Sequence, residues 1–142
     1  MHLEESKYRL IIRKKITTTE GNFYVFDKYV VGEIFEGVSF DWPAAQKVIE
    51  EVYKYFGTSD IKISYISNRV NSYSVHPQDW AKFFSNRHKL NCVAVVTHNK
   101  LGVTSIILEK LFIQTKLKKF MSLDNAIVWA KMQNGKTEKE TA

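Results

Sequence analysis

Short runs of apolar and polar residues, separated by turn residues, make up the beginning of the chain. Residues 8–17, 22–27 and 29–37 are rich in β-branched and aromatic residues. Such runs with turns between them predict an antiparallel meander of three strands. Gly32 lies inside the third run, where a glycine indicates a bulge or a close approach of another group to the backbone.

The next segment has the spacing of an amphipathic helix over residues 42–56. Asp41 is placed to cap its first turn, Pro43 is tolerated there because the N–H that it lacks has no helical partner, and Gly57 is a common terminator. The apolar residues that recur on one side, and that we expect to face the core, are Trp42, Ala45, Val48, Ile49, Val52 and Phe56.

The second half alternates strands with helices. We expect strands at 61–67, 91–97 and 117–121, and helices at 76–87, 103–114 and 122–133, the last capped by Ser122. The almost continuous apolar run 91–97 is typical of a central strand covered on both faces. Repeated strand–helix–strand units require a parallel or mixed sheet with right-handed crossovers.

These elements predict an α/β fold with a mixed, mainly parallel sheet, an antiparallel N-terminal meander and about four helices. We expect one domain over residues 1–133, because no linker interrupts the pattern, and a disordered polar tail over residues 134–142.

Composition narrows the class of protein. The chain has 142 residues, of which 44% are hydrophobic and 25% charged, as in ordinary globular domains. Its apolar runs are too short to cross a bilayer, and the N-terminus, which carries acids, does not read as a secretory signal, so we expect a soluble cytoplasmic protein. The single cysteine, Cys92, excludes an internal disulfide and predicts a buried apolar side chain.

The net charge of +6 does not by itself indicate nucleic-acid binding. Basic residues alternate with apolar ones, as on the solvent face of a strand or helix, so nucleic acid is an unfavoured partner. The two basic clusters are Lys7, Arg9, Arg13, Lys14 and Lys15, and then Lys110, Lys116, Lys118 and Lys119.

The segment 61–80 carries the candidate site, because its polar loop leaves the carboxyl end of a strand and leads into a helix. In α/β folds this is where ligands bind, and a free helix N-terminus attracts anions. The candidate binding residues are Asn68, Arg69, Asn71, Ser72, Tyr73, Ser74 and His76. Arg69 is suited to hold a phosphate or carboxylate with two hydrogen bonds. The alternative is that the Asn and Ser residues shape the turn while Arg69 pairs with a surface acid.

The order of the elements and the residue pattern in the second half of the chain resemble the STAS-like, or anti-sigma-factor-antagonist-like, domain family and the related lipid-exchange-like bacterial proteins. The resemblance rests on the apolar strand Cys92–Val96, the short strand ending in Lys119-Phe120 and the closing segment Ser122–Ala130, and it spans residues 22 to 132. In STAS regulators a serine in the corresponding loop is phosphorylated by a partner kinase. Ser72 and Ser74 are the matching candidates, although Asn71 stands where the family pattern has an aspartate.

The resemblance and the loop together predict a non-enzymatic binding or regulatory module. It would use the Asn68–His76 loop and the following helix to engage a protein partner or a small anionic ligand. The alternative is a carrier of a lipid or apolar small molecule, whose helices would cover a cavity rather than a solid core. A third hypothesis, from another class, is a small hydrolase that uses Ser74 and His76.

Other partners and cofactors follow from what the sequence contains. No Walker loop, dinucleotide-binding glycine pattern or zinc-protease motif is present, so the sequence implies no cofactor. His76, His98 and Asp79 lack the spacing of metal ligands. The aromatic residues within 23–35, placed on an edge sheet, offer a surface for a homodimer.

Overall fold

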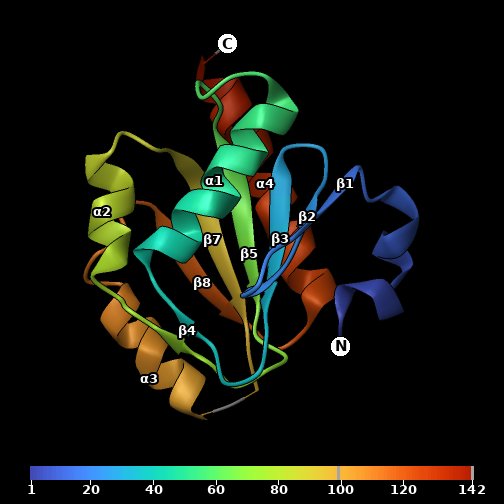
Figure 1. Ribbon diagram of the computed structural model, residues 1–142. Helices are drawn as coiled ribbons and strands as arrows, with labels where there is room; N and C mark the ends of the chain where they lie inside the picture. Colours follow the sequence, from blue (N-terminus) through green and yellow to red (C-terminus); the bar gives the residue numbers. More distant parts are fainter. Residues whose placement is uncertain (99, 142) are drawn as a thin grey trace.

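A six-stranded mixed sheet forms the centre of the protein (Figure 1). The computed structural model describes residues 1–98 and 100–141. The strands lie in the order β1 (Lys14–Thr17), β2 (Gly21–Val25), β3 (Tyr29–Ile34), β5 (Ile63–Asn68), β7 (Leu90–Val96) and β8 (Lys116–Phe120). The pairs β1–β2 and β2–β3 are antiparallel, and every pair from β3 onward is parallel. This confirms the predicted mixed sheet with an antiparallel meander at one edge.

Helices cover both faces of this sheet. They are α1 (Trp42–Phe56), α2 (Asp79–Ser85), α3 (Lys100–Glu109) and α4 (Leu123–Thr141). Figure 1 shows α1 crossing in front of the sheet and α4 running behind it. A second, two-stranded parallel sheet joins β4 (Ser39–Phe40) to β6 (Ser74–Val75), and it ties the segment before α1 to the segment before α2. Within the described residues, no helix combines the length and the apolar character needed to cross a membrane.

The helix ends follow the predicted local rules. The Asp41 carboxylate accepts a hydrogen bond from the Ala44 N–H at 3.1 Å, and Gly57 ends α1 with a φ of 74°. The Ser122 hydroxyl accepts from the Asn125 N–H at 3.1 Å at the start of α4. These short-range contacts explain why the helix boundaries there were predictable.

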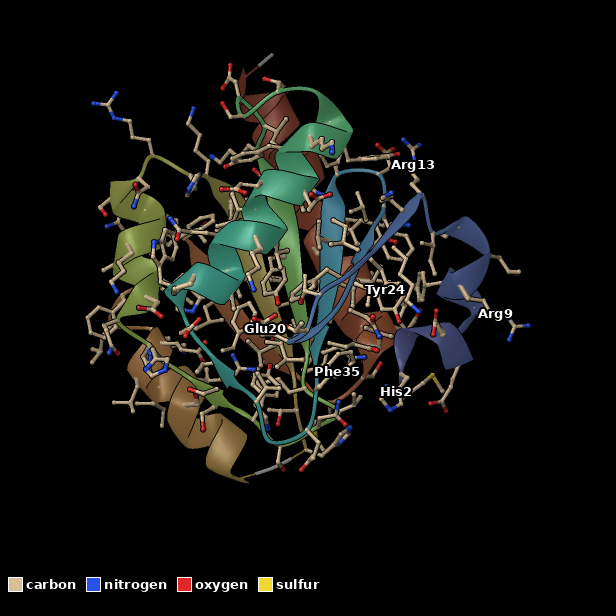
Figure 2. The ribbon with its side chains drawn as sticks, in the orientation of Figure 1. His2, Arg9, Arg13, Glu20, Tyr24 and Phe35 are labelled. Atoms are coloured by element: carbon tan, nitrogen blue, oxygen red, sulfur yellow. The ribbon has the colours of Figure 1, made fainter. Side chains whose placement is uncertain are left out.

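The N-terminal segment differs from the prediction, because only the end of 8–17 is a strand. Two 3-10 turns, Leu3–Glu5 and Lys7–Ile11, precede β1. The Ser6 hydroxyl accepts from the Tyr8 N–H and donates to the Leu3 carbonyl at 2.6 Å, and this favours turns over an extended chain. Leu3 and Tyr8 are buried, whereas Arg9 is exposed and points away from the body of the molecule (Figure 2).

The two faces of the sheet bury different side chains. The face under α4 buries one cluster, to which the N-terminal turns contribute. Its members are Leu3, Tyr8, Tyr24, Phe26, Tyr29, Val31, Ile66, Cys92, Ala94, Val96, Leu123, Ala126, Ile127 and Ala130. The face under α1, α2 and α3 buries Ile16, Phe23, Val25, Val30, Ile34, Val48, Val52, Ile63, Leu90, Val93, Val95 and Ile106. Cys92 is buried as expected, and burial raises the pKa of its thiol to about 11.

The aromatic rings of β2 and β3 lie inside the protein and not on an exposed edge. Phe23, Tyr24, Phe26 and Tyr29 are each 1% exposed, because β1 pairs outside β2 and side chains cover both faces. The expected aromatic surface at residues 23–35 is therefore buried within the chain. Phe35, just after β3, is the partly exposed ring of this segment.

The C-terminal segment is helical where a disordered tail was predicted, since α4 continues to Thr141. The reason is visible at Asn134, which is buried and accepts hydrogen bonds from the Ser64 hydroxyl at 2.7 Å and the Asn91 amide at 2.6 Å. Its own amide donates to the Lys28 carbonyl at 2.9 Å. Long-range bonds thus hold a residue that in sequence resembles the end of a helix. Ala142 lies outside the described residues.

Candidate functional site

An apolar cavity of about 160 Å³ lies between α1, α2 and the face of the sheet that these helices cover. Its apolar wall comes from β2, β3, β5 and β7 of the main sheet on one side and from the two helices on the other, and the small β4–β6 sheet adds Phe40 and Val75. The wall residues are Phe23, Val30, Ile34, Phe40, Trp42, Ala45, Val48, Ile49, Val52, Ile61, Ile63, Val75, Trp80, Phe83 and Leu90. This volume matches that of cavities that bind benzene-sized molecules, about 150 Å³.

The floor of the cavity holds a buried ion pair between Arg69, just after β5, and Glu109, at the end of α3. The Arg69 Nη2 atom donates to both carboxylate oxygens of Glu109 at 2.8 Å, and the two side chains are 9% and 2% exposed. Glu109 also accepts from the Trp80 indole N–H at 3.0 Å and from the Ser105 hydroxyl at 3.0 Å. The carboxylate is therefore saturated with donors, as a buried charge requires.

Three hydroxyl groups line the same floor. The Ser67 hydroxyl accepts from Arg69 Nε at 3.1 Å and lies 3.2 Å from the Tyr73 hydroxyl. Burial raises the pKa values of Tyr65 and Tyr73, so both phenols are neutral at pH 7. Burial opposes the charge of Arg69, but neighbouring Tyr73 and Glu109 outweigh it and raise the pKa of the guanidinium. The floor combines one fixed charge pair with neutral donors.

Gly32 on β3 makes room for one of these phenols. A Cβ atom at this position would lie 2.2 Å from the Tyr65 hydroxyl oxygen and 3.0 Å from the Phe23 ring. The predicted close approach at Gly32 is therefore present, and it places Tyr65 against the sheet on the cavity side.

The helix that closes the cavity, α2, is held by ring contacts rather than by deep burial. It contains no fully buried residue. Trp80 and Phe83 meet edge to face with ring centres 5.7 Å apart, and Phe83 lies 5.1 Å from the His88 ring. His88 Nδ1 lies 2.6 Å from the Tyr53 hydroxyl on α1, and partial burial lowers the pKa of the imidazole. A lightly packed helix next to a cavity is an element that can move to admit a ligand.

The structure distributes the predicted loop residues over three environments. Asn68 points to the opposite face of the sheet, where its amide donates to Glu33 at 2.7 Å and to the Met1 carbonyl at 2.9 Å. Arg69 and Tyr73 belong to the cavity floor. Arg69 does pair with an acid, but that acid is buried Glu109 and not a surface residue.

Of the remaining loop residues, one holds the loop in place and the others are exposed at the surface. Asn71 donates to the Ile34 carbonyl at 2.9 Å and so braces the loop against the end of β3. Ser72 and Ser74 are exposed, and the Ser72 N–H donates to Glu36 at 2.8 Å. His76 is exposed at the cavity rim.

The contacts of His76 bear on the hydrolase hypothesis. His76 Nε2 lies 3.1 Å from the Ser39 hydroxyl, so its serine neighbour is Ser39 and not Ser74. In the described part of the chain no carboxylate pairs with His76, although a triad needs such a group to orient the imidazole. The described residues also contain no cluster of three metal-ligating His, Cys, Asp or Glu side chains.

Glu109 and Trp80 are the functional candidates that sequence reasoning missed. Glu109 is the single acid of the largely apolar stretch Ile106–Phe112, where Lys110 is the other charge, and an acid among apolar residues is a weak signal of a buried pair. Its partner lies 40 residues away in sequence, and nothing local identifies it.

Comparisons with known proteins support the fold. No family model matches the chain, and no curated protein matches it either. Among solved structures, the chain is similar to an uncharacterised protein of the DUF3478 family from Shewanella loihica PV-4, described as having a SpoIIAA-like fold. The two are 9% identical over 82% of this chain and 90% of that one, with a TM-score of 0.53. The chain therefore has a SpoIIAA-like, that is STAS-like, α/β fold.

Proposed function

We propose that this protein is a non-enzymatic binding module for a small apolar molecule, held in the cavity beneath α1 and α2. The observation that carries the proposal is the cavity itself, an apolar space of about 160 Å³ on one face of a sheet whose other face is filled by α4. Ligand sites in proteins are concave and mostly apolar, with a few polar groups that fix orientation.

The floor restricts the chemistry of the ligand. At the floor, the charges of Arg69 and Glu109 neutralise each other. The other charged lining residues also have partners: the Asp41 carboxylate accepts from the Ala44 N–H, Asp79 pairs with Lys82, and Lys89 pairs with Asp60. The hydroxyl groups of Ser67 and Tyr73 remain as neutral polar neighbours, and His76 lies at the rim. The preferred ligand is accordingly a neutral apolar molecule with at most one hydroxyl-like group, rather than a small anion.

The test is thermal unfolding with 1-octanol as the probe and octanoate as its charged counterpart. A ligand that binds only the folded state raises the melting temperature by mass action. We expect 1-octanol to raise it more than octanoate does. The Ala45→Trp variant, which fills the cavity, should lose the response, whereas Ala81→Trp on the exposed side of α2 should keep it.

Equal responses of the two variants, or no response of the wild type to 1-octanol, would contradict the proposal. Extraction of the purified protein with organic solvent, followed by mass spectrometry, would identify a ligand that co-purifies.

A second candidate function, engagement of a protein partner, has one observation in its favour. Ser72 and Ser74 are exposed on a loop whose backbone is fixed: the Gly37 N–H donates to the Ser72 carbonyl at 2.7 Å and the Ser74 N–H to the Val38 carbonyl at 2.9 Å. A phosphoryl group on Ser72 would add a charge of roughly −1.5 to −2 beside Glu36 and repel that carboxylate.

This second candidate predicts that a partner captured by the wild type is lost with Ser72→Asp and kept with Ser72→Ala. Arg69 is unsuitable for the same experiment, because removing it breaks the buried pair and would confuse folding with binding.

A further inference from the structure

A second hollow, of about 480 Å³, lies at the amino-terminal ends of the parallel strands, away from the cavity floor. Lys62 precedes β5, Asn91 lies at the start of β7, Lys116 at the start of β8 and Lys136 on α4. The other lining residues are Ile113, Gln114, Thr115 and Gln133. A hollow of this size is within the range of small-molecule sites.

The charged residues described in the lining of this hollow are all basic. Its described lining holds three lysines and no acid. Lys116 Nζ donates to the Gln133 side chain at 3.2 Å, which places the ammonium group against α4. Lys62 and Lys136 form no ion pair with any described residue. Three lysines that line one hollow, with no acid in its described lining, attract a multivalent anion.

Asn91 adds a feature that lysines on an ordinary surface lack. Asn91 as a whole residue is 9% exposed, and its amide nitrogen donates to the Lys62 carbonyl at 3.1 Å and to Asn134 Oδ1 at 2.6 Å. These two acceptors fix the orientation of the amide, because reversing it would set oxygen against oxygen. The Asn91 Oδ1 atom is then buried without a hydrogen-bond donor among the described residues.

An acceptor left without a donor is costly, so a site that contains one is suited to a ligand that supplies an O–H group. We propose that this hollow binds a small phosphorylated molecule that carries a free hydroxyl group. The lysine ammonium groups would hold the phosphate and Asn91 Oδ1 would accept from the hydroxyl. The site is separate from the apolar cavity and does not depend on the function proposed for it.

The experiment is calorimetric titration of the full chain with glycerol 3-phosphate and with methyl phosphate, which has the same charge but no hydroxyl. We expect glycerol 3-phosphate to bind more tightly, about fivefold or more, because one additional hydrogen bond is made. Equal affinities for the two phosphates would overturn the role of Asn91.

Two double variants distinguish specific binding in this hollow from non-specific attraction by the positive net charge of the protein. Lys62→Gln/Lys136→Gln should weaken glycerol 3-phosphate about tenfold or more, since two charge-assisted contacts are lost. Lys14→Gln/Lys54→Gln changes the net charge equally at exposed positions outside the hollow and should alter affinity less than twofold. No binding to the wild type, or an equal loss in both double variants, would overturn the proposal.

Discussion

The two faces of the sheet differ in how completely side chains fill the space between the sheet and the helices that cover it. The face under α4 is filled by aromatic rings from the sheet and small to medium side chains from the helix, where Ala126, Ile127 and Ala130 are each 0% exposed. The face under α1 and α2 has a comparable apolar cluster, yet it leaves a cavity of about 160 Å³, and α2 buries no residue completely.

We infer from this difference that the face under α4 is structural and that the hollow face is the one used by the proposed binding function. Interiors are normally packed without voids, because a void forfeits dispersion contacts and hydrophobic burial. A cavity that persists beside a well-filled face, with a buried ion pair at its floor, is a feature maintained at a cost in stability. The proposed binding of an apolar molecule would account for both the space and the light packing of α2.

The largest effect is expected from breaking the ion pair at the cavity floor. Glu109→Ala leaves Arg69 charged and buried, so the free energy of unfolding should fall by about 3–5 kcal/mol. Urea denaturation measures this change. The double variant Arg69→Met/Glu109→Met should recover most of it, because no unpaired charge remains. A Glu109→Ala variant as stable as the wild type would show that the pair does not hold the hollow face together.

The contrast between the faces is sharpened by one matched pair of substitutions. Ala130→Leu inserts atoms into the filled face and should lower the free energy of unfolding by about 1–3 kcal/mol. Ala45→Leu places the same atoms next to the cavity and should leave stability unchanged or raise it slightly. Both are measured by urea denaturation at one pH, and equal losses in the two variants would mean that the two faces do not differ in packing.

The smallest effect concerns pH and the closure of α2. Burial lowers the pKa of His88 in the folded protein below its usual value of 6.5, so the unfolded chain takes up the proton first. The stability that the protein gains from burying neutral His88 is fully present above about pH 6.5. It is lost as the pH falls through the lowered pKa that His88 has in the folded protein. His88→Phe, which keeps a ring against Phe83, should reduce the decline in melting temperature between pH 7 and pH 5. An unchanged decline would remove His88 as its cause.

How much the sequence could predict depends on the range of the interactions involved. Asp41, Gly57 and Ser122 act on neighbours within a few residues, and their helix boundaries were predicted correctly. The apolar run 91–97 was likewise sufficient to identify the central strand β7. These features are local, so one stretch of sequence contains all the partners.

The cavity and its floor could not be predicted in the same way. Arg69 was expected to face a ligand, but its partner Glu109 lies 40 residues away at the end of α3, and only the fold brings them together. Asn134 was interpreted as the start of a disordered tail, whereas bonds to Ser64, Asn91 and Lys28 keep it in α4. A void has no signature in sequence, because it is defined by what the surrounding side chains fail to fill.

The central claim is tested most directly by methyl-resolved NMR during titration with 1-octanol. The account predicts chemical-shift changes at Val30, Val48, Val52, Ile63 and Leu90, which line the cavity. The methyl groups of Val31, Ile66, Ala126 and Ile127, on the filled face, should stay unchanged. Changes spread equally over both faces, or none at all, would contradict the conclusion that the hollow face is a binding site.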